Sequence, residues 1–349
     1  MGQKNIRVIF IVAFIVGFFG LTGTSLAAAD PNANAKAKAI LAWLTNLPNQ
    51  STNRLVAGQH TYMYDNLIST IHNNTGKYVG LSGIDYFYEN NTSTNNQAAT
   101  WFNTNHALIT VCHHLNNPKT GGDAWDTNFT DSDMDSLITN GTSLNTTFNG
   151  VLNSIASGLT TLQNAGVVVL YRPFHEQDGG WFWWGGKTPA KMIALWKYVF
   201  NYMTTTKDLH NLIWVWNTNG GLTWSYYPGS AYVDIVSADL YGYPPNAAVS
   251  GYSSLSTYGK PFALGEYGPC GASGCTSAVD MRNFLSGVKS NMPKTVYWME
   301  WAENFSLAYH SNVSDVFNDP WVVTADDIPT FSGGGDTTPP SPPARLRAQ

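Results

Sequence analysis

Short apolar runs recur along this chain, and polar, glycine-rich stretches separate them. Most of the runs are continuously apolar rather than alternating, which is typical of strands that are covered on both faces. We therefore expect eight strands, at residues 55–58, 78–84, 107–112, 167–171, 212–216, 235–239, 262–265 and 296–301.

Helical periodicity is visible between these runs. An opening helix is expected over residues 33–47, and the clearest later helices cover residues 188–204 and 276–290. In the first of the later helices, Thr188 has the N-cap position and Pro189 the first helical position. Buried strands that alternate with helices favour an α/β fold, a (β/α)8 TIM barrel. A doubly wound open sheet is the alternative, but no Gly-x-Gly-x-x-Gly follows a first strand.

The two ends of the chain differ from the middle. Lys4 and Arg7 precede an apolar run, and small residues follow it, so residues 1–28 resemble a secretory signal peptide. A membrane anchor is the alternative, but the apolar run is shorter than the ~20 residues that a span needs. Residues 333–349 are rich in Gly and Pro and predict a linker. We expect this linker to lead to a further module, in which case the chain would be a fragment of a longer protein. One large domain, residues 29–332, lies between these segments.

The composition narrows the classes of partner. Charged residues make up 12% of the chain, against about 25% in an average domain. A net charge of −5 gives no reason to expect nucleic acid or an anionic membrane as a partner. The 13 Trp, 18 Tyr and 16 Phe exceed what a core needs, so we expect many of them to line a binding surface. We expect a secreted, extracellular monomer.

Cysteines are few. Cys270 and Cys275 bracket a Gly-Ala-Ser-Gly loop, and we predict a disulfide between them in an oxidising compartment. Cys112 lies in an apolar run and is expected to be a buried, inert thiol. No Cys-x-x-Cys pair or matching histidine spacing accompanies the cysteines, so we expect no metal site and no cofactor.

The most informative stretch covers residues 171–186, Tyr-Arg-Pro-Phe-His-Glu-Gln-Asp-Gly-Gly-Trp-Phe-Trp-Trp-Gly-Gly. An apolar run leads directly into Arg172, His175 and Glu176. A carboxyl group can move a proton or attack a carbon, and flat rings can stack on the apolar faces of sugars. This pattern therefore predicts chemistry on a carbohydrate, with Arg172 among the residues expected to bind the substrate.

A second candidate carboxyl group, Glu266, follows the apolar run of residues 262–265. It lies 90 residues after Glu176, or about three βα units at ~30 residues each. The fourth and seventh strands would then face each other across the mouth of the barrel, where active sites of this fold lie. Two carboxyl groups ~5–5.5 Å apart are the arrangement of a retaining glycosidase. Glu300 and Glu303 are a competing pair, but neither lies in a comparable motif.

These residues carry a family resemblance. Arg-Pro-Phe-His-Glu, followed by Gly-Gly-Trp-Phe-Trp-Trp-Gly, resembles the signature of glycoside hydrolase family 26, which consists chiefly of endo-β-1,4-mannanases. Shorter matches run along most of residues 55–330 in the order of the family, at Leu55-Val-Ala-Gly-Gln59, His114-Leu-Asn-Asn-Pro118, Tyr227-Pro-Gly, Tyr232-Val-Asp-Ile-Val236, Asp239-Leu-Tyr241 and Gly265-Glu-Tyr-Gly268.

The resemblance implies a (β/α)8 barrel with Glu176 as the catalytic acid/base and Glu266 as the nucleophile. It implies that His175 contacts the sugar near the cleavage point and that Trp181 stacks on the leaving-group sugar. It also implies that Tyr241 donates a hydrogen bond to the nucleophile.

The resemblance further implies that His114 binds the sugar under attack and that Trp301 forms a platform beneath it. The choice of His114 over His113 rests on the Asn-Asn-Pro spacing, because Cys112-His113 stands where many relatives have a small residue and Trp.

Elementary electrostatics supports the two glutamate roles. Glu266 must be ionised to attack the anomeric carbon, and Arg172 and a tyrosine hydroxyl would stabilise its charge. Glu176 must carry a proton, and a dry position against Trp181 and Trp183 would raise its pKa. Trp183 and Trp184 could equally be packed under the loop.

The leading hypothesis is a secreted, retaining endo-β-1,4-mannanase that acts on mannan, glucomannan or galactomannan. Cleavage of mixed-linkage β-glucan or β-1,3-xylan by the same carboxyl pair is the alternative within the family. A non-catalytic carbohydrate-binding protein is a remote alternative, because both glutamates are present.

Overall fold

The computed structural model describes residues 26–62, 66–242, 244–271 and 273–331. The linker expected over residues 333–349 and nearly all of the expected signal peptide lie outside the described residues.

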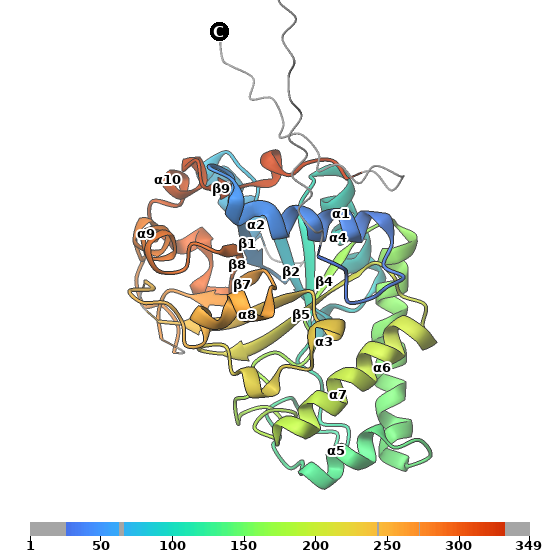
Figure 1. Ribbon diagram of the computed structural model, residues 1–349. Helices are drawn as coiled ribbons and strands as arrows, with labels where there is room; N and C mark the ends of the chain where they lie inside the picture. Colours follow the sequence, from blue (N-terminus) through green and yellow to red (C-terminus); the bar gives the residue numbers. More distant parts are fainter. Residues whose placement is uncertain (1–25, 63–65, 243, 272, 332–349) are drawn as a thin grey trace, which may run out of the picture.

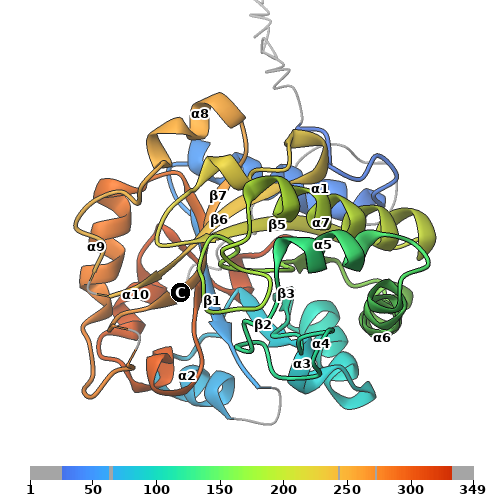
Figure 2. The same cartoon turned by 90° about the horizontal axis from the view of Figure 1, so that it is seen from below.

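The described part of the chain contains a closed barrel of eight parallel strands (Figures 1 and 2). The strands are β1 (Leu55–His60), β2 (Leu81–Asp85), β3 (Leu108–Cys112), β4 (Val169–Tyr171), β5 (Leu212–Asn219), β6 (Ile235–Tyr241), β7 (Phe262–Gly268) and β8 (Thr295–Glu300). β1 pairs with both β2 and β8, which closes the barrel and excludes the open sheet. The expected TIM barrel is confirmed.

Helices surround the barrel in Figure 2. They are α1 (Ala35–Asn46), α2 (Leu67–Thr75), α3 (Tyr86–Glu89), α4 (Thr92–Thr104), α5 (Asp131–Ile138), α6 (Ser143–Asn164), α7 (Pro189–Asn201), α8 (Leu255–Tyr258), α9 (Met281–Asn291) and α10 (Val313–Asn318). None of the helices in the described ranges has the length and apolar character that crossing a membrane requires.

One end of the barrel is closed by α1. This helix crosses the upper end of the strands in Figure 1. Its buried side chains Ile40 and Leu44 belong to one hydrophobic cluster with strand residues that include Val56, Leu81 and Ile213, which lie near the starts of β1, β2 and β5. Because this apolar plug fills the N-terminal end, a binding site has to lie at the opposite, C-terminal end of the strands.

Several strands end later than their apolar runs predict. The sheet pairing of β5, β6 and β7 continues to Asn219, Tyr241 and Gly268, because polar residues at these ends still hydrogen-bond to their neighbours. β2 starts three residues later than expected, and Val79 instead pairs in an isolated antiparallel bridge with Thr324. A short strand that the sequence did not predict, β9 (Val322–Val323), pairs with the start of β1.

Two helices also differ from expectation. α7 does begin at Pro189, but within the described residues the side chain of Thr188 makes no capping hydrogen bond, and residues 202–206 form a π-helical turn. α9 begins five residues late, at Met281, because the Asp280 side chain caps it by accepting a hydrogen bond from the Arg282 N–H.

A β-bulge in the pairing of β6 with β7 determines where Glu266 lies. Ala238 pairs with Leu264, but the next residue, Asp239, pairs with Glu266, so Gly265 is the extra residue. A Cβ atom on Gly265 would lie 2.6 Å from Asn217 Nδ2 and 2.8 Å from Asp239 Oδ1. Only glycine fits here, and the bulge places Glu266 beside Asp239.

Candidate active site

A cavity of about 580 Å³ opens at the C-terminal ends of the strands. The residues predicted from sequence that line it are His114, His175, Glu176, Trp181, Tyr241, Glu266 and Trp301. Tyr62, Trp125, Phe182, Asn219, Glu303 and Phe305 complete the lining. A larger cavity of about 820 Å³ lies against residues 26–32 and includes neither glutamate, so the smaller one is the candidate site.

Both carboxylate oxygens of Glu266 are held in place. Oε1 accepts a hydrogen bond from Nη2 of Arg172 at 2.5 Å, and Oε2 accepts one from the Tyr241 hydroxyl at 2.7 Å. Burial and the charge of Glu266 raise the pKa of Tyr241, which keeps its phenol protonated and able to donate. These contacts fix the orientation of Glu266 toward the cavity.

Arg172 lies beneath the site and bridges two carboxylates. Its Nη1 donates to Oδ2 of Asp239 at 3.0 Å, and Asn217 donates to the other oxygen of Asp239 at 2.6 Å. Burial opposes the charge on Arg172, but Asp239 and Glu266 outweigh it and raise its pKa. Arg172 was expected to bind substrate; instead it is 2% exposed and absent from the described cavity lining, so it positions Glu266.

Glu176 has a different environment. Its backbone is left-handed, with φ of 50°, and its N–H donates to Oδ1 of Asn217 at 2.7 Å, which holds this strained turn. Burial, and then the negative charge of Glu266, raise its pKa to about 8. Hydrogen bonding from Trp181 and the charge of Arg172 act in the opposite direction. Glu176 is therefore protonated at neutral pH, as a general acid has to be.

The tryptophans after Glu176 have separate roles. Trp181 is 39% exposed and faces the cavity, whereas Trp183 and Trp184 are fully buried. The indole of Trp183 donates to the carbonyl of Leu115 at 2.9 Å, behind the cavity. Trp183 and Trp184 therefore match the alternative in which they are packed under the loop, and Phe182 lines the cavity.

The structure distinguishes the two adjacent histidines. His113 points away from the cavity and shares a hydrogen bond of 2.9 Å with the Tyr171 hydroxyl. His114 lines the cavity, and its Nδ1 lies 2.5 Å from Oδ2 of Asp85, at the end of β2. Sequence reasoning missed Asp85, although the signal was the same as for the glutamates, an acidic residue at the end of an apolar strand.

Aromatic rings form the walls of the cavity. Trp301 packs against the His60 ring at 4.1 Å between centroids, and Trp125 stacks on the His114 ring at 5.3 Å. Trp125, which is 50% exposed, was not predicted from sequence. These apolar faces suit a sugar, because pyranose rings stack on exposed aromatic side chains.

The competing carboxyl pair does not converge. Glu300 is fully buried outside the cavity lining and accepts a hydrogen bond from the Trp298 indole at 3.1 Å. Burial raises its pKa well above the usual range. Glu303 lines the cavity mouth and is exposed.

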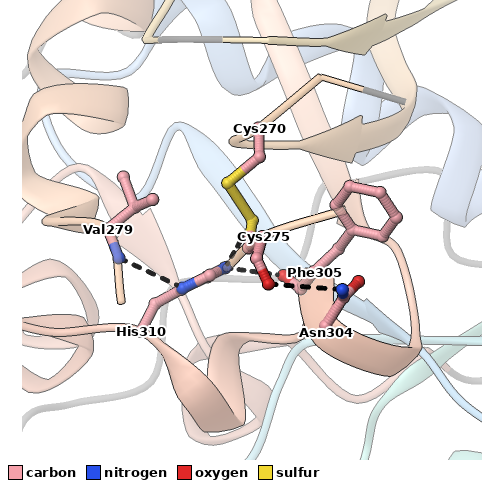
Figure 3. The surroundings of a disulfide bond; sticks show 6 residues. All are labelled: Cys270, Cys275, Val279, Asn304, Phe305 and His310. Atoms are coloured by element: carbon pink, nitrogen blue, oxygen red, sulfur yellow. Dashed lines mark hydrogen bonds between the residues drawn. A yellow bond between two sulfur atoms is a disulfide. The ribbon is translucent and has the colours of Figure 1, made fainter. Parts of the chain in front are cut away.

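A disulfide joins Cys270 and Cys275 near the cavity (Figure 3). Asn304 donates to the carbonyl of Cys275 at 3.3 Å, and the neighbouring Phe305 packs against Tyr241 at 5.3 Å between centroids. The disulfide loop thus supports a segment of the cavity wall. Cys112 is a free, buried thiol. Within the described ranges, no group of His, Cys, Asp and Glu side chains is arranged to hold a metal ion.

Comparison with known proteins agrees with this geometry. The model of the family described as Glycosyl hydrolase family 26 matches residues 29–327. The chain belongs to this family. As a family 26 protein, it is a glycoside hydrolase, and the resemblance expected from the tryptophan-rich motif is confirmed.

Several relatives of this family 26 chain are similar over most of its length. Mannan endo-1,4-beta-mannosidase A and B of Caldalkalibacillus mannanilyticus is 33% identical, over 92% of this chain and 68% of the relative. Mannan endo-1,4-beta-mannosidase of Bacillus subtilis is 30% identical, over 93% of this chain and 95% of the relative. The solved structure of a Bacillus subtilis mannanase has a TM-score of 0.81 at 30% identity, and the match covers 88% of this chain and 97% of that one.

Proposed function

We propose that this glycoside hydrolase is an endo-β-1,4-mannanase that cleaves mannan, glucomannan and galactomannan with retention of configuration. The names of the relatives support the substrate class. The observation that carries the mechanism is the contrast between two glutamates in one cavity. Glu176 is dry and protonated, whereas Glu266 accepts hydrogen bonds from Arg172 and Tyr241 on both carboxylate oxygens.

In the first step, Glu266 attacks the anomeric carbon while Glu176 gives its proton to the departing glycosidic oxygen. The bond between the anomeric carbon and that oxygen breaks, and an ester forms with Glu266. Arg172 and Tyr241 orient the attacking carboxylate, and the indole N–H of Trp181 donates a hydrogen bond to the acid.

In the second step, Glu176 takes a proton from water, and the water oxygen attacks the anomeric carbon. The ester bond to Glu266 breaks and the carboxylate is restored. Ester formation removes the negative charge of Glu266, which is the second-largest cause of the raised pKa of Glu176. Glu176 therefore loses its proton more readily in the intermediate and can act as a base.

The cavity lining supports the sugar contacts that the family resemblance implies. Trp181 stacks on the leaving-group sugar, Trp301 lies under the sugar that is attacked, and His114 and His175 contact that sugar at the cleavage point. Trp125 adds a further exposed ring.

Small nucleophiles distinguish the two glutamate roles. With an activated manno-oligosaccharide, Glu176→Ala in azide should be rescued and yield a β-glycosyl azide, because azide attacks the ester from the side of the departed sugar. Glu266→Ala in azide should yield an α-glycosyl azide, because azide replaces the carboxylate. Near-full activity of either variant on soluble mannan without azide would overturn the proposal.

Parallel assays on mannan, mixed-linkage β-glucan and β-1,3-xylan test the substrate. The proposal requires mannan to be cleaved fastest, with a ladder of internal products from a defined manno-oligosaccharide. Faster release of reducing sugar from glucan or xylan would support the alternative specificity within the family, and release of single end units would exclude endo cleavage.

We also propose that the protein is secreted and acts as a monomer, and that residues 333–349 link it to a further module. The basic residues, apolar run and small residues within positions 1–28 support secretion. N-terminal sequencing of protein from the culture medium tests this, and intracellular retention of the full chain would contradict it. Light scattering of the purified enzyme tests the monomer.

A further inference from the structure

We propose that Asp85 is a positioning residue that fixes which ring nitrogens of His114 and His175 carry protons in the cleft. This inference rests on the proposed function of the cleft, because its consequence for catalysis requires both rings to contact the sugar. Asp85 itself does not line the described cavity.

Hydrogen bonds hold the buried carboxylate of Asp85 in place at the end of β2. It is 1% exposed, and its Oδ1 accepts hydrogen bonds from the backbone N–H of Phe87 at 2.9 Å and of His114 at 3.2 Å. Its Oδ2 lies 2.5 Å from Nδ1 of His114. Burial opposes ionisation of Asp85, but the hydrogen bond from His114, the charge that this ring carries when protonated, and the hydrogen bond from the Phe87 N–H together lower the pKa of Asp85. A carboxylate only accepts, so Nδ1 of His114 has to carry a proton.

The tautomer of His175 depends on the tautomer of His114. Nε2 of His114 lies 3.0 Å from Nε2 of His175, and a hydrogen bond between them holds one proton. The proposal includes a neutral His114 ring: with its one proton on Nδ1, its Nε2 is bare, so His175 has to donate from its own Nε2. Protons on both ring nitrogens of wild-type His114 would contradict this step.

His175 fits this assignment. Burial, His114 and Arg172 lower its pKa well below the usual value, so the ring is neutral. Its Nδ1 is then unprotonated, and this atom is buried without a hydrogen-bond partner among the described residues. Phe182 packs against both rings, at centroid distances of 5.2 Å from His114 and 5.0 Å from His175.

Replacing one carboxylate oxygen of Asp85 with an NH₂ group should reverse the direction of two hydrogen bonds, the one between Asp85 and His114 and the one between His114 and His175. In Asp85→Asn, the side-chain oxygen keeps the two backbone hydrogen bonds, and the NH₂ group faces Nδ1 of His114. His114 then has to hold its proton on Nε2 and donate it to His175. The proton of His175 moves to Nδ1, where no acceptor is available, so both rings present altered edges to the sugar.

Ring tautomers can be read without any substrate. In protein labelled with ¹⁵N-histidine, long-range ¹H–¹⁵N correlation distinguishes protonated from bare ring nitrogens. Asparagine variants of His114 and His175 assign the signals. We expect wild-type His114 as the Nδ1–H form and His175 as the Nε2–H form, and the opposite pattern for both in Asp85→Asn.

Kinetics supply the second readout. We expect kcat of Asp85→Asn on manno-oligosaccharide to fall roughly 10- to 100-fold, the scale of one hydrogen bond to a buried polar group, while KM changes much less. Asp234→Asn is the matched control, because Asp234 is also 1% exposed and accepts backbone hydrogen bonds, from Ala29 at 2.7 Å and Trp214 at 2.8 Å, but lies outside the cavity lining. Its kcat should stay near wild type.

A bare Nδ1 on wild-type His114 would overturn the inference, even if Asp85→Asn failed to fold. Unchanged tautomers in a folded Asp85→Asn protein would also overturn it, and so would reversed tautomers with unchanged kcat. If the wild-type enzyme did not cleave mannan, the proposed function would fail while the spectra still decided the role of Asp85 in setting the tautomers.

Discussion

Trp181 donates its indole N–H to Oε2 of Glu176 at 2.7 Å. The same indole is 39% exposed to the cavity, so one side chain offers a ring face to the sugar and a hydrogen bond to the acid. Because the N–H favours the ionised carboxylate, this contact lowers the pKa of Glu176 and opposes the effect of burial.

The first prediction concerns this contact. In the wild-type enzyme, kcat/KM should decline as pH rises through about 8, because Glu176 loses the proton that it has to donate. Trp181→Phe keeps an aromatic ring but removes the N–H, so the pKa of Glu176 should rise and the alkaline limb should move to higher pH. A pH profile of kcat/KM measures the shift.

Trp125→Phe provides the control for that profile. Trp125 lines the same cavity but stacks on His114, and its substitution should leave the alkaline limb in place. A shift of equal size in both variants, or a shift of Trp181→Phe to lower pH, would contradict the assigned contact.

The raised pKa of Glu176 also predicts how stability depends on pH. The pKa of about 8 in the folded state lies above the ordinary pKa of 4.5, so between these pH values the folded state binds more protons than the unfolded state. The stability that Glu176 contributes is therefore complete below about pH 4.5 and is lost as pH rises through about 8. Glu176→Gln removes this loss because an amide does not ionise.

Thermal unfolding of both proteins across pH checks this sign. Glu176→Gln should melt a few degrees above wild type at pH 9 and within about one degree of it at pH 5. A variant that melts below wild type at pH 9 would show that burial does not disfavour the ionised Glu176.

Tyr241→Phe should slow catalysis without weakening substrate binding. The hydroxyl touches Oε2 of Glu266 at 2.7 Å, and its loss leaves the nucleophile oriented by Arg172 alone. We expect kcat to fall roughly 10- to 100-fold with little change in KM, since one hydrogen bond to a charged group is removed. Steady-state kinetics decides this, and a kcat within twofold of wild type would refute the positioning role.

The disulfide should stabilise the fold. Cys270 and Cys275 are five residues apart, and opening so short a loop is expected to cost about 2 kcal/mol. Urea denaturation should show this loss in a Cys270→Ser/Cys275→Ser protein. Dithiothreitol should lower the urea midpoint of the wild type and leave the double variant unchanged; equal sensitivity of both proteins would assign the effect to another group.

Much of the barrel could be predicted from sequence because its strands are buried on both faces and read as apolar runs. Their C-terminal ends could not, because Asn217, Asn219 and Glu266 are polar and still belong to strands. The residues that end the apolar pattern are those that form the site. The bulge at Gly265 was hidden for the same reason, since glycine in a strand reads as its end.

Some residues of the candidate site could also be predicted from sequence, and others could not. Glu176 and Trp181 could be found because they lie in one continuous motif, and Glu266 because it repeats the strand-exit pattern. Asp85 shares that strand-exit pattern, but its contact with His114, which lies 29 residues away in sequence, is visible only in the tertiary structure, and so is the contact of Trp125 with His114. The placement of Arg172 beneath the cavity also required tertiary structure, since its sequence position fits a substrate contact equally well.

The central claim is that Glu266 forms a covalent bond to the sugar as Glu176 protonates the leaving group. A 2-fluoro manno-oligosaccharide with an activated leaving group slows breakdown of the ester and allows it to accumulate. Mass spectrometry of a peptic digest should then locate one added glycosyl unit on the peptide that contains Glu266. A glycosyl unit on Glu176, on Glu303 or on no peptide while the reagent is turned over would contradict the account.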